Sequence, residues 1–522
     1  MKRTPRYLTL AVFTAGMTTM AVEMCASRLL GNVFGTSNLV WANIIGLILV
    51  YLAAGYFIGG RWADRDPRPV TFYRLLAWAA LVTAVVPVIA RPVLQAAASA
   101  VEGINAAVAL GSFAAVLVLF VVPVTLLGCV SPFAIRLALQ EVDSAGNVAG
   151  RLYAVSTFGS ILGTFLPVLW LIPAIGTTRT FLLFSGILLG VALFGLARVE
   201  RRAAVIALWM PVALIGLTLL GASGPVKQTR GQLMEKESAY NYIQVVERDG
   251  MRLLLLNEGQ GVHSVYRPGE LATYGTWDYF LAAPFFNAVP YPAMNVDSLA
   301  IVGLAAGTTA RQFTAVYGPI AIDGFEIDPA IIDVGRTYFD MNEPNLRALA
   351  VDGRWGLAHS GKSYRVIAVD AYRPPYIPWH LTTREFFELV RSKLSPDGVL
   401  VINVARMPAD RRLVEAMTAT LAAVFPSVYV VDVPDSLNSI LYATVLPTQA
   451  ENLARNLAGL QIADPPVHPF LLDVLTRTLE NLRPAVLGGV VFTDDRAPVE
   501  QLTNAMVVRF VLGGGLDSIE PQ

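Results

Sequence analysis

The chain has 522 residues, of which 55% are hydrophobic and 15% are charged, and its mean hydropathy is +0.55. This composition excludes a purely soluble protein, since soluble domains carry about 25% charged residues. The net charge of zero hides an asymmetry, because residues 1–222 hold 15 Lys and Arg against 7 Asp and Glu, whereas the remainder holds 24 against 32. The basic excess lies in short loops between apolar runs, so no nucleic-acid partner is expected.

Seven apolar runs in the first 222 residues are long enough to cross a bilayer, which needs about 20 residues per helix. The runs cover residues 7–30, 38–60, 72–91, 105–129, 151–173, 180–197 and 203–221. The first has a basic lead but no small-residue cleavage site, so we interpret it as a transmembrane helix rather than a signal peptide. Arg and Lys gather at the amino terminus and in every second loop, which predicts a cytoplasmic amino terminus.

Two stretches of this half resemble major-facilitator transporters. "GGRWADRDPRP" (59–69) is similar to the loop after their second helix, and "GSILGTFLP" (159–167) is similar to their glycine-rich fifth helix. The alternative is that small residues let helices pack closely. Only half of a transporter's helices are present, which argues against a complete carrier. Glu23 is an acid inside an apolar run, and it is either functional or part of a local polar cluster near the helix end.

Cys25 and Cys129 both lie in apolar segments, so neither a disulfide framework nor a cysteine-based metal site is predicted. A polar linker, residues 223–235, ends the membrane domain. The next runs, "YNYIQVVERDG" and "MRLLLLNEG", predict a β-hairpin turning at Asp249-Gly250. We assign residues 236–290 to this small β subdomain.

Residues 291–522 alternate between apolar strand-like runs and amphipathic helical runs. The strands are predicted at 298–304, 320–328, 346–353, 364–372, 398–405, 427–434 and 439–447. Such β-α-β alternation predicts an α/β domain with a doubly wound, largely parallel, Rossmann-like sheet.

Acidic residues end three successive predicted strands. Glu326, Asp352 and Asp370 therefore share the edge of the sheet at which doubly wound folds bind ligands. Gly303 and Gly307 flank the turn after the first strand, but their spacing is not a dinucleotide fingerprint. Because no phosphate-binding glycine run or lysine is present, an adenosine sulfonium fits this edge better than a pyrophosphate.

Several of these stretches resemble motifs of the polyamine aminopropyltransferases, the spermidine synthase family. The stretches are "ESAYNYIQV" (237–245), "IVGLAAGTTARQF" (301–313), "GFEIDPAII" (324–332), "VDGR" (351–354), "YRVIAVDAY" (364–372) and "TDDRAPVE" (493–500). The whole chain thus resembles a bacterial spermidine synthase homologue fused to a multi-span membrane domain, and its sheet is expected to be of the methyltransferase and spermidine synthase type.

The resemblance implies a role for each matching residue. Asp370 would deprotonate the attacking amine, and the nucleoside donor would be bound by Gly303, Gly307, Glu326, Ile327, Asp352 and Gly353. The acceptor side would contain Tyr240, Gln244, Asp278, Tyr372 and Arg373. The donor would be decarboxylated S-adenosylmethionine or S-adenosylmethionine as a co-substrate, with no tightly bound cofactor and no metal.

The chain departs from the family's pattern at three places. Ala306 stands where the family's glycine loop carries an aspartate, and Arg373 stands in the region of a diamine-binding acid. Trp277-Asp278 replaces a Tyr-His-Glu segment. Exchanging an acid for an arginine reverses the sign of charge, which argues against putrescine as the acceptor.

Two alternatives to an aminopropyltransferase stay open. One is a methyltransferase-like enzyme that uses S-adenosylmethionine with another nucleophile, and the other is a non-catalytic nucleoside- or polyamine-sensing domain on a half-transporter-like membrane domain. His263 and His380 are looser site candidates, each with a structural alternative.

The expected location is the cell membrane, with the lipid bilayer, a small amine acceptor and a second copy of the chain in a homodimer as partners. Seven spans with a cytoplasmic amino terminus would place the soluble half outside the cell, where the donor is not expected. The run 203–221 is interrupted by Pro211 and is the most doubtful span. We therefore expect the soluble half to be cytoplasmic.

Overall fold

The computed structural model describes residues 6–34, 38–100, 107–139, 144–221, 229–257, 261–372 and 376–512. The chain forms two compact units. The first comprises residues 1–228 with 235–242, and the second comprises residues 229–234 with 243–522.

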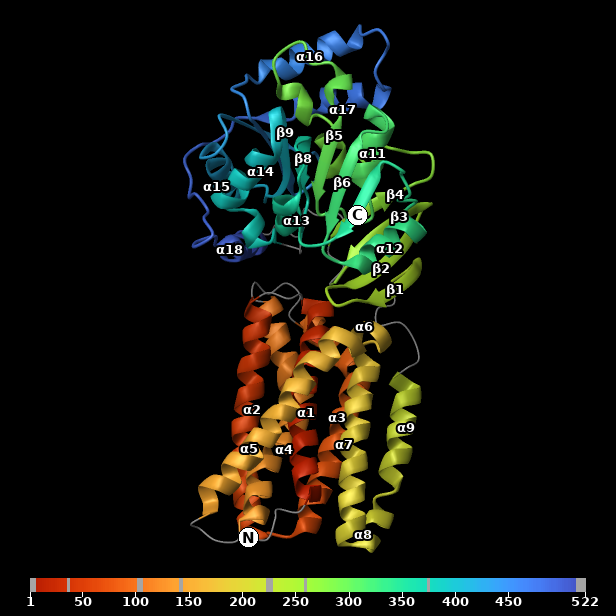
Figure 1. The fold of residues 1–522 in the computed structure, drawn as a ribbon, viewed down its shortest axis with the longest axis vertical. Coiled ribbons are helices and arrows are strands. Elements are labelled where there is room, and N and C mark those ends of the chain that lie inside the picture. Colours follow the sequence, from red (N-terminus) through yellow and green to blue (C-terminus); the bar gives the residue numbers. More distant parts are fainter. Residues whose placement is uncertain are drawn as a thin grey trace. The chain divides into compact units, whose positions relative to one another are not determined.

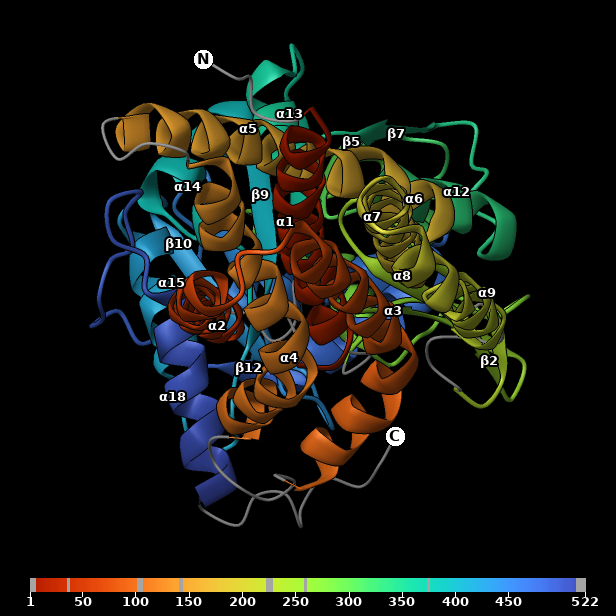
Figure 2. The same cartoon turned by 90° about the horizontal axis from the view of Figure 1, so that it is seen from below.

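The amino-terminal unit is helical. Its helices are α1 (Arg6–Phe34), α2 (Asn38–Arg65), α3 (Pro69–Ala100), α4 (Ala107–Ala138), α5 (Ala145–Leu166), the π-helical turn η2 (Pro167–Leu171), α6 (Ile172–Ile175), α7 (Thr177–Val199), α8 (Arg201–Ile206) and α9 (Trp209–Gly221). Figure 2 looks along several of these long helices. In the described residues, seven helical segments are long and apolar enough to cross a membrane, which agrees with the seven predicted runs. The last segment is divided between α8 and α9, two residues before Pro211.

Glycines bring pairs of these helices into backbone contact. A Cβ atom added at Gly159 or Gly163 of α5 would lie 2.1 or 2.0 Å from the carbonyl oxygens of Phe13 and Met17 on α1. These distances are far below van der Waals contact, so any side chain would push the two helices apart. The glycines of "GSILGTFLP" therefore serve close helix packing in this structure, while the resemblance to a transporter stays a prediction.

The small β subdomain is a four-stranded antiparallel sheet in the order β1-β2-β3-β4. Its strands are β1 (Gln232–Glu237), β2 (Tyr242–Arg248), β3 (Met251–Leu256) and β4 (Val262–Tyr266). The predicted turn between β2 and β3 is present, with positive φ at both Asp249 and Gly250, as the tightest hairpin turns require. One face of the sheet packs on the larger domain, where Ile243 and Leu254 share a buried cluster with Ile331.

The larger domain is built on an eight-stranded sheet, in the order β12-β10-β11-β9-β8-β5-β6-β7 (Figure 1). Its strands are β5 (Ser298–Val302), β6 (Ala321–Glu326), β7 (Leu346–Ala350), β8 (Tyr364–Val369), β9 (Leu394–Ala405), β10 (Ser427–Asp432), β11 (Asn438–Thr444) and β12 (Leu482–Arg483). The five strands β5 to β9 are parallel, and β11 is antiparallel to both β9 and β10. The predicted doubly wound, largely parallel sheet is confirmed.

Helices cover both faces of this sheet. They are α10 (Thr276–Phe280), α11 (Thr308–Tyr317), α12 (Pro329–Tyr338), α13 (Gly353–His359), α14 (Arg384–Lys393), α15 (Arg412–Ala422), α16 (Glu451–Gln461), α17 (Pro469–Glu480) and α18 (Val499–Leu512), with short 3₁₀ turns η3 (Ala283–Phe286), η4 (Ala293–Asn295) and η5 (Trp379–Leu381). Alternate residues of β5 face opposite ways: Ile301 joins the core under α11, α16 and α17, and Ala300 joins the core under α13, α14 and α15. The strands are apolar on both faces because both faces are covered.

The strand order reverses beside β5. From β5 the chain proceeds outward to β6 and β7, and then returns to β8 on the other side of β5. In open α/β sheets, ligands bind outside the carboxyl ends of the strands at such a reversal. The functional site is therefore expected at the loops that follow β5 and β8.

Candidate active site

The loop after β5 lies directly against the residues that follow β8. Gly303 has φ +91°, and a Cβ atom there would lie 2.6 Å from the carbonyl oxygen of Asp370 and 2.7 Å from Cα of Ala371. Both the backbone conformation and this close approach require glycine. Gly307, with φ +88°, immediately precedes α11, and a Cβ atom there would meet the Met341 side chain. Thus two glycines singled out in the sequence shape the loop, and one of them abuts Asp370.

Glu326 ends β6 and is held by backbone amides on both sides. Its Oε2 accepts a hydrogen bond from the Ala305 amide at 3.0 Å, and its Oε1 accepts one from the Asp328 amide at 3.1 Å. Burial raises the pKa of this carboxyl to about 7, although these hydrogen bonds oppose the rise. The next residue, Ile327, is exposed. Glu326 therefore links the glycine loop to its own strand end, at the edge where a ligand would bind.

Asp352 caps helix α13. Its Oδ1 accepts a hydrogen bond from the Trp355 amide at 2.9 Å, and its Oδ2 lies 3.2 Å from Nε2 of His380. The hydrogen bond from His380 is the main reason that the pKa of Asp352 is lowered. Gly353 opens the helix, where a Cβ atom would lie 2.5 Å from a methyl carbon of Val302 on β5. His380 therefore has a side-chain partner at this edge of the sheet.

Asp370 follows β8 and is half-buried. Burial raises the pKa of its carboxyl to about 7, and hydrogen bonds from the side chains of Asn403 and Trp277 lower it in part. The bond from Nδ2 of Asn403 to Oδ1 measures 2.9 Å. The Asp370 amide continues the sheet by donating to the carbonyl of Val302 at 2.9 Å. A carboxylate with its pKa near neutrality, held by two neutral donors, is suited to general-base chemistry.

A chain of amides leads to this carboxylate. Asn438, at the start of β11, donates from Nδ2 to Oδ1 of Asn403 at 2.7 Å, which orients the Asn403 amide so that its Nδ2 faces Asp370. Asn403 is 5% exposed and lies inside the apolar strand β9. No sequence motif pointed to Asn403. The available signal was a buried-strand position occupied by a polar residue, "VLVINVA", on the strand after that of Asp370.

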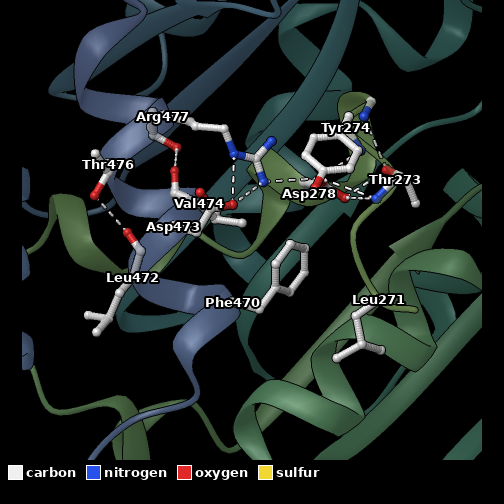
Figure 3. A network of polar contacts seen from close by, with 12 residues as sticks. Leu271, Thr273, Tyr274, Asp278, Phe470, Leu472, Asp473, Val474, Thr476 and Arg477 are labelled. Carbon is white, nitrogen blue, oxygen red and sulfur yellow. Dashed lines mark hydrogen bonds and ion pairs between the residues drawn. The ribbon is translucent and has the colours of Figure 1, made fainter. Parts of the chain in front are cut away.

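Asp278 occupies a buried hydrogen-bond network, shown in Figure 3. The network also contains Thr273, Tyr274, Gln312 and Arg477. The Asp278 carboxylate is fully buried and accepts from the amides of Thr273 and Tyr274, from Nε2 of Gln312 at 2.7 Å and from Nη2 of Arg477 at 3.2 Å.

These donors occupy both Asp278 oxygens, so Asp278 fastens the 271–275 loop and α10 to α17. The acceptor-side role expected of Asp278 stays a prediction. The neighbouring Trp277 is the residue of α10 that reaches Asp370.

The remaining predicted acceptor-side residues are placed as follows. Gln244 is buried in β2, where its Nε2 donates to Gln232 and Thr229 of the same unit. Tyr372 donates its hydroxyl to the Asn403 carbonyl at 3.2 Å, and burial followed by the charge of Asp370 raises the pKa of this hydroxyl. Tyr240 is exposed and lies in the 235–242 segment of the first unit. Arg373 lies outside the described residues, so its predicted role stays a prediction.

Strand β4 covers the glycine loop. The Ala306 amide donates to Oγ of Ser264 at 2.9 Å, and Thr308 exchanges hydrogen bonds with the backbone of Val265. Burial lowers the pKa of His263, next to Ser264, to about 4, so this imidazole is neutral at pH 7. Across the described parts of the chain, no three His, Cys, Asp or Glu side chains gather as a metal site would need.

Comparisons with known proteins concern the carboxyl-terminal half. Residues 291–455 match the Spermine/spermidine synthase domain family. A "Probable polyamine aminopropyl transferase" of Bifidobacterium longum is 33% identical over 282 residues, which is 51% of this chain and 61% of that protein. The human "eEF1A lysine and N-terminal methyltransferase" is 28% identical over 165 residues, which is 29% of this chain and 23% of that protein.

Among solved structures, a probable spermidine synthase from Corynebacterium glutamicum matches with a TM-score of 0.39 and 20% identity, over 51% of this chain and 97% of that one. In the sequence comparison, this chain covers about six-tenths of the length of the Bifidobacterium longum protein. All of the sheet's ligand edge described above, from Gly303 to Asn403, lies inside the matched family domain.

Proposed function

We propose that the carboxyl-terminal half is an aminopropyltransferase that moves a three-carbon amine from decarboxylated S-adenosylmethionine to an amine acceptor, with Asp370 as general base. The observation that carries this proposal is the Asp370 carboxyl, whose pKa is about 7, placed against Gly303 at the reversal of the sheet within the spermine/spermidine synthase match. The relatives named as aminopropyl transferases support the same reaction class.

The reaction requires a group that accepts a proton from the amine and a preorganised site that binds decarboxylated S-adenosylmethionine. An ammonium has no lone pair, so the acceptor amine must lose a proton before its nitrogen attacks the carbon next to the sulfonium. The new C–N bond forms as the C–S bond breaks, and the sulfur leaves with the electron pair as a neutral thioether, methylthioadenosine. The proton passes to Asp370 and then to water. The carboxylate also stabilises the cationic amine as the charge moves from sulfur to nitrogen.

Glu326 and Asp352 are the proposed nucleoside contacts. The Glu326 carboxylate would accept hydrogen bonds from the ribose hydroxyls, and Asp352 would accept one from the adenine amino group. Supporting this, both lie at the carboxyl edge, and Ile327 and Trp355 beside them are exposed apolar side chains against which a purine could pack.

The decisive experiment uses the full chain purified in detergent. The protein is incubated with decarboxylated S-adenosylmethionine and a panel of amines, and methylthioadenosine release is measured. Wild-type protein should release it in an amine-dependent manner, whereas Asp370→Asn should lose at least a hundredfold in rate while binding methylthioadenosine within a few-fold of wild type. Full turnover by the variant would exclude Asp370 as the base, and no release with any amine would exclude the reaction.

A second candidate is methyl transfer from S-adenosylmethionine, which the similarity to the human methyltransferase favours. Ala306 is consistent with it, because its buried side chain offers no carboxylate for the donor's amino group. The same assay separates the two reactions. Methyl transfer would consume S-adenosylmethionine and release S-adenosylhomocysteine instead of methylthioadenosine. Nucleoside binding without either product would favour the sensing alternative.

We further propose that the amino-terminal helices anchor the protein in the cell membrane, with the catalytic half in the cytoplasm. The seven long apolar segments support the anchoring. Two reporter enzymes are fused in turn to the carboxyl terminus, one that is active only inside the cell and one that is active only outside it. Their activities show on which side of the membrane the catalytic half lies. The proposed homodimer is tested by the mass of the detergent-solubilised protein in light scattering.

A further inference from the structure

Helix α1 carries a carboxylate inside a segment that is long and apolar enough to cross a membrane. The segment is Tyr7–Gly31, and Glu23 is its only acidic residue. The helix packs against α2, α3, α4, α5 and α7, so other helices of the same unit surround much of it. Carboxylates within membrane helices are costly, face the interior of the helix bundle or a water-filled space, and mark pathways for ions or substrates.

Glu23 has no counter-ion in this position. Its side chain is half-buried, and among the described residues it forms neither a hydrogen bond nor an ion pair. Arg28, the basic residue of the same segment, donates instead to the carbonyl of Ala239, between β1 and β2. Removing an unpaired charge from water is unfavourable, so this carboxylate must either hold a proton or meet a cation that binds to it.

Two hydroxyl groups flank Glu23 on the same face of α1. Thr19 and Ser27 lie four residues before and after it, and both are half-buried. Residues at this spacing follow one another along one side of a helix. Oγ1 of Thr19 donates to the Ala15 carbonyl at 2.8 Å. Oγ of Ser27 donates to the Met24 carbonyl, also at 2.8 Å. Because a hydroxyl has one proton, each oxygen can only accept a further hydrogen bond.

The polar stripe formed by Thr19, Glu23 and Ser27 therefore offers acceptors and a negative charge. It suits ammonium groups, which carry three donors and no acceptor. Successive members of the stripe lie about 6 Å apart along the helix, which rises about 1.5 Å per residue. Two ammonium nitrogens joined by three or four carbons are a similar distance apart. Met20 and Met24, half-buried beside Glu23, supply flexible apolar surface for the methylene groups.

We propose that the polar stripe binds a diamine or a longer polyamine, with one ammonium on the Glu23 carboxylate and a second on the hydroxyl oxygen of Thr19 or Ser27. The bound cation keeps Glu23 ionised and neutralises its charge. The stripe belongs to the helical unit, so it is distinct from the proposed transferase site and does not require the transfer reaction. Only its link to the reaction product, also a polyamine, rests on the proposed function.

The test is labelling with dicyclohexylcarbodiimide, which modifies protonated carboxyl groups in apolar surroundings. The full chain is purified in detergent and labelled with or without an amine, and peptide mass spectrometry locates the adduct at Glu23. We expect labelling without amine and protection by putrescine, because a bound ammonium keeps the carboxylate ionised. Half-protection should require a concentration of putrescine about tenfold lower than that of butylamine, since the second ammonium of putrescine binds intramolecularly.

Thr19→Val combined with Ser27→Ala removes both hydroxyls and leaves Glu23 in place. This double variant should still be labelled and protected by butylamine, but putrescine should lose its advantage of about tenfold, the worth of one hydrogen bond to a charged group. Thr14→Val is the matched control. The Thr14 hydroxyl also donates to a carbonyl four residues earlier, but at nine residues from Glu23 it lies on the opposite side of α1.

The wild-type protein decides the proposal even if the double variant does not fold. Absence of the adduct at Glu23, or protection by putrescine no better than by butylamine or by sodium chloride of equal ionic strength, overturns it. An unchanged putrescine advantage in the folded double variant also overturns it. Glu23→Gln should remove this adduct and leave methylthioadenosine release unchanged, so failure of the transfer reaction is recognised separately.

Discussion

Asn403, on strand β9, donates a hydrogen bond at 2.9 Å to the carboxylate of Asp370, the residue that directly follows the neighbouring parallel strand β8. The amide of Asn403 is in turn oriented by Asn438, so the carboxylate is held by a relay that no sequence-local contact could supply. Because the bond is made to the ionised form, it lowers the pKa of Asp370, in opposition to burial. Asn403 is therefore a positioning residue for the proposed base.

Asn403→Ala should reduce kcat about tenfold and should move the ascending limb of the pH–rate profile to higher pH. The reason is that the carboxylate loses a donor that favours its charged form, so its pKa rises above about 7. Asn438→Ala leaves the Asn403 donor in place and should change the profile less. A tenfold loss of rate with an unmoved pH profile would indicate that Asn403 is merely structural.

Glu326→Gln should reduce the dependence of stability on pH. The folded-state pKa of Glu326 is raised from 4.5 to about 7, so the stability it contributes is fully present below about pH 4 and is lost as the pH rises to about 7. The loss is on the order of 3 kcal/mol, since each pKa unit corresponds to 1.36 kcal/mol. Melting temperatures of both proteins between pH 4 and pH 8 measure it. Parallel curves for wild type and variant would contradict the raised pKa.

Gly303→Ala should destabilise the carboxyl-terminal half by on the order of 3 kcal/mol and should also abolish transfer. Alanine is strained at φ +91°, and its Cβ would collide with backbone atoms of residues 370 and 371, which cannot move without displacing the proposed base. Gly361→Ala is the matched control, because a Cβ atom there meets nothing within 4 Å. Denaturant unfolding compares the two, and equal stability of the variants would refute the close approach.

Arg477→Met should destabilise the same half by about 3 kcal/mol, because it leaves the fully buried Asp278 carboxylate without its cationic partner. Asp473→Ala removes the exposed partner of Arg477 and should cost less than about 1 kcal/mol. Thermal unfolding distinguishes the variants. A cost for Arg477→Met as small as that for Asp473→Ala would show that Thr273, Tyr274 and Gln312 alone satisfy Asp278.

The doubly wound sheet and its acidic edge were predictable because their signals are local. Each parallel strand is a short apolar run, and the residue that follows such a run must lie at the ligand edge, which is how Glu326, Asp352 and Asp370 were selected. The glycine requirement at position 303 was equally visible as a Gly at a strand end.

The contacts that orient these residues were not predictable, because they are long-range. Arg477 lies 199 residues from Asp278, and Asn403 lies 33 residues from Asp370. Whether Trp277 or Asp278 faces Asp370 depends on how helix α10 is rotated about its axis. Successive side chains on a helix point about 100° apart, so the five-residue α10 can direct only one of them at the base. That rotation is decided by the buried salt bridge to α17.

The raised pKa values of Glu326 and Asp370 change how many protons the folded protein binds near neutral pH. Because burial raises the pKa of both carboxyls to about 7, a fraction of each stays protonated near neutral pH. Any ligand that favours the ionised form of either group must then expel protons as it binds. Nucleoside binding to this site should consequently show a heat that changes with the ionisation enthalpy of the buffer, and the change counts the protons released.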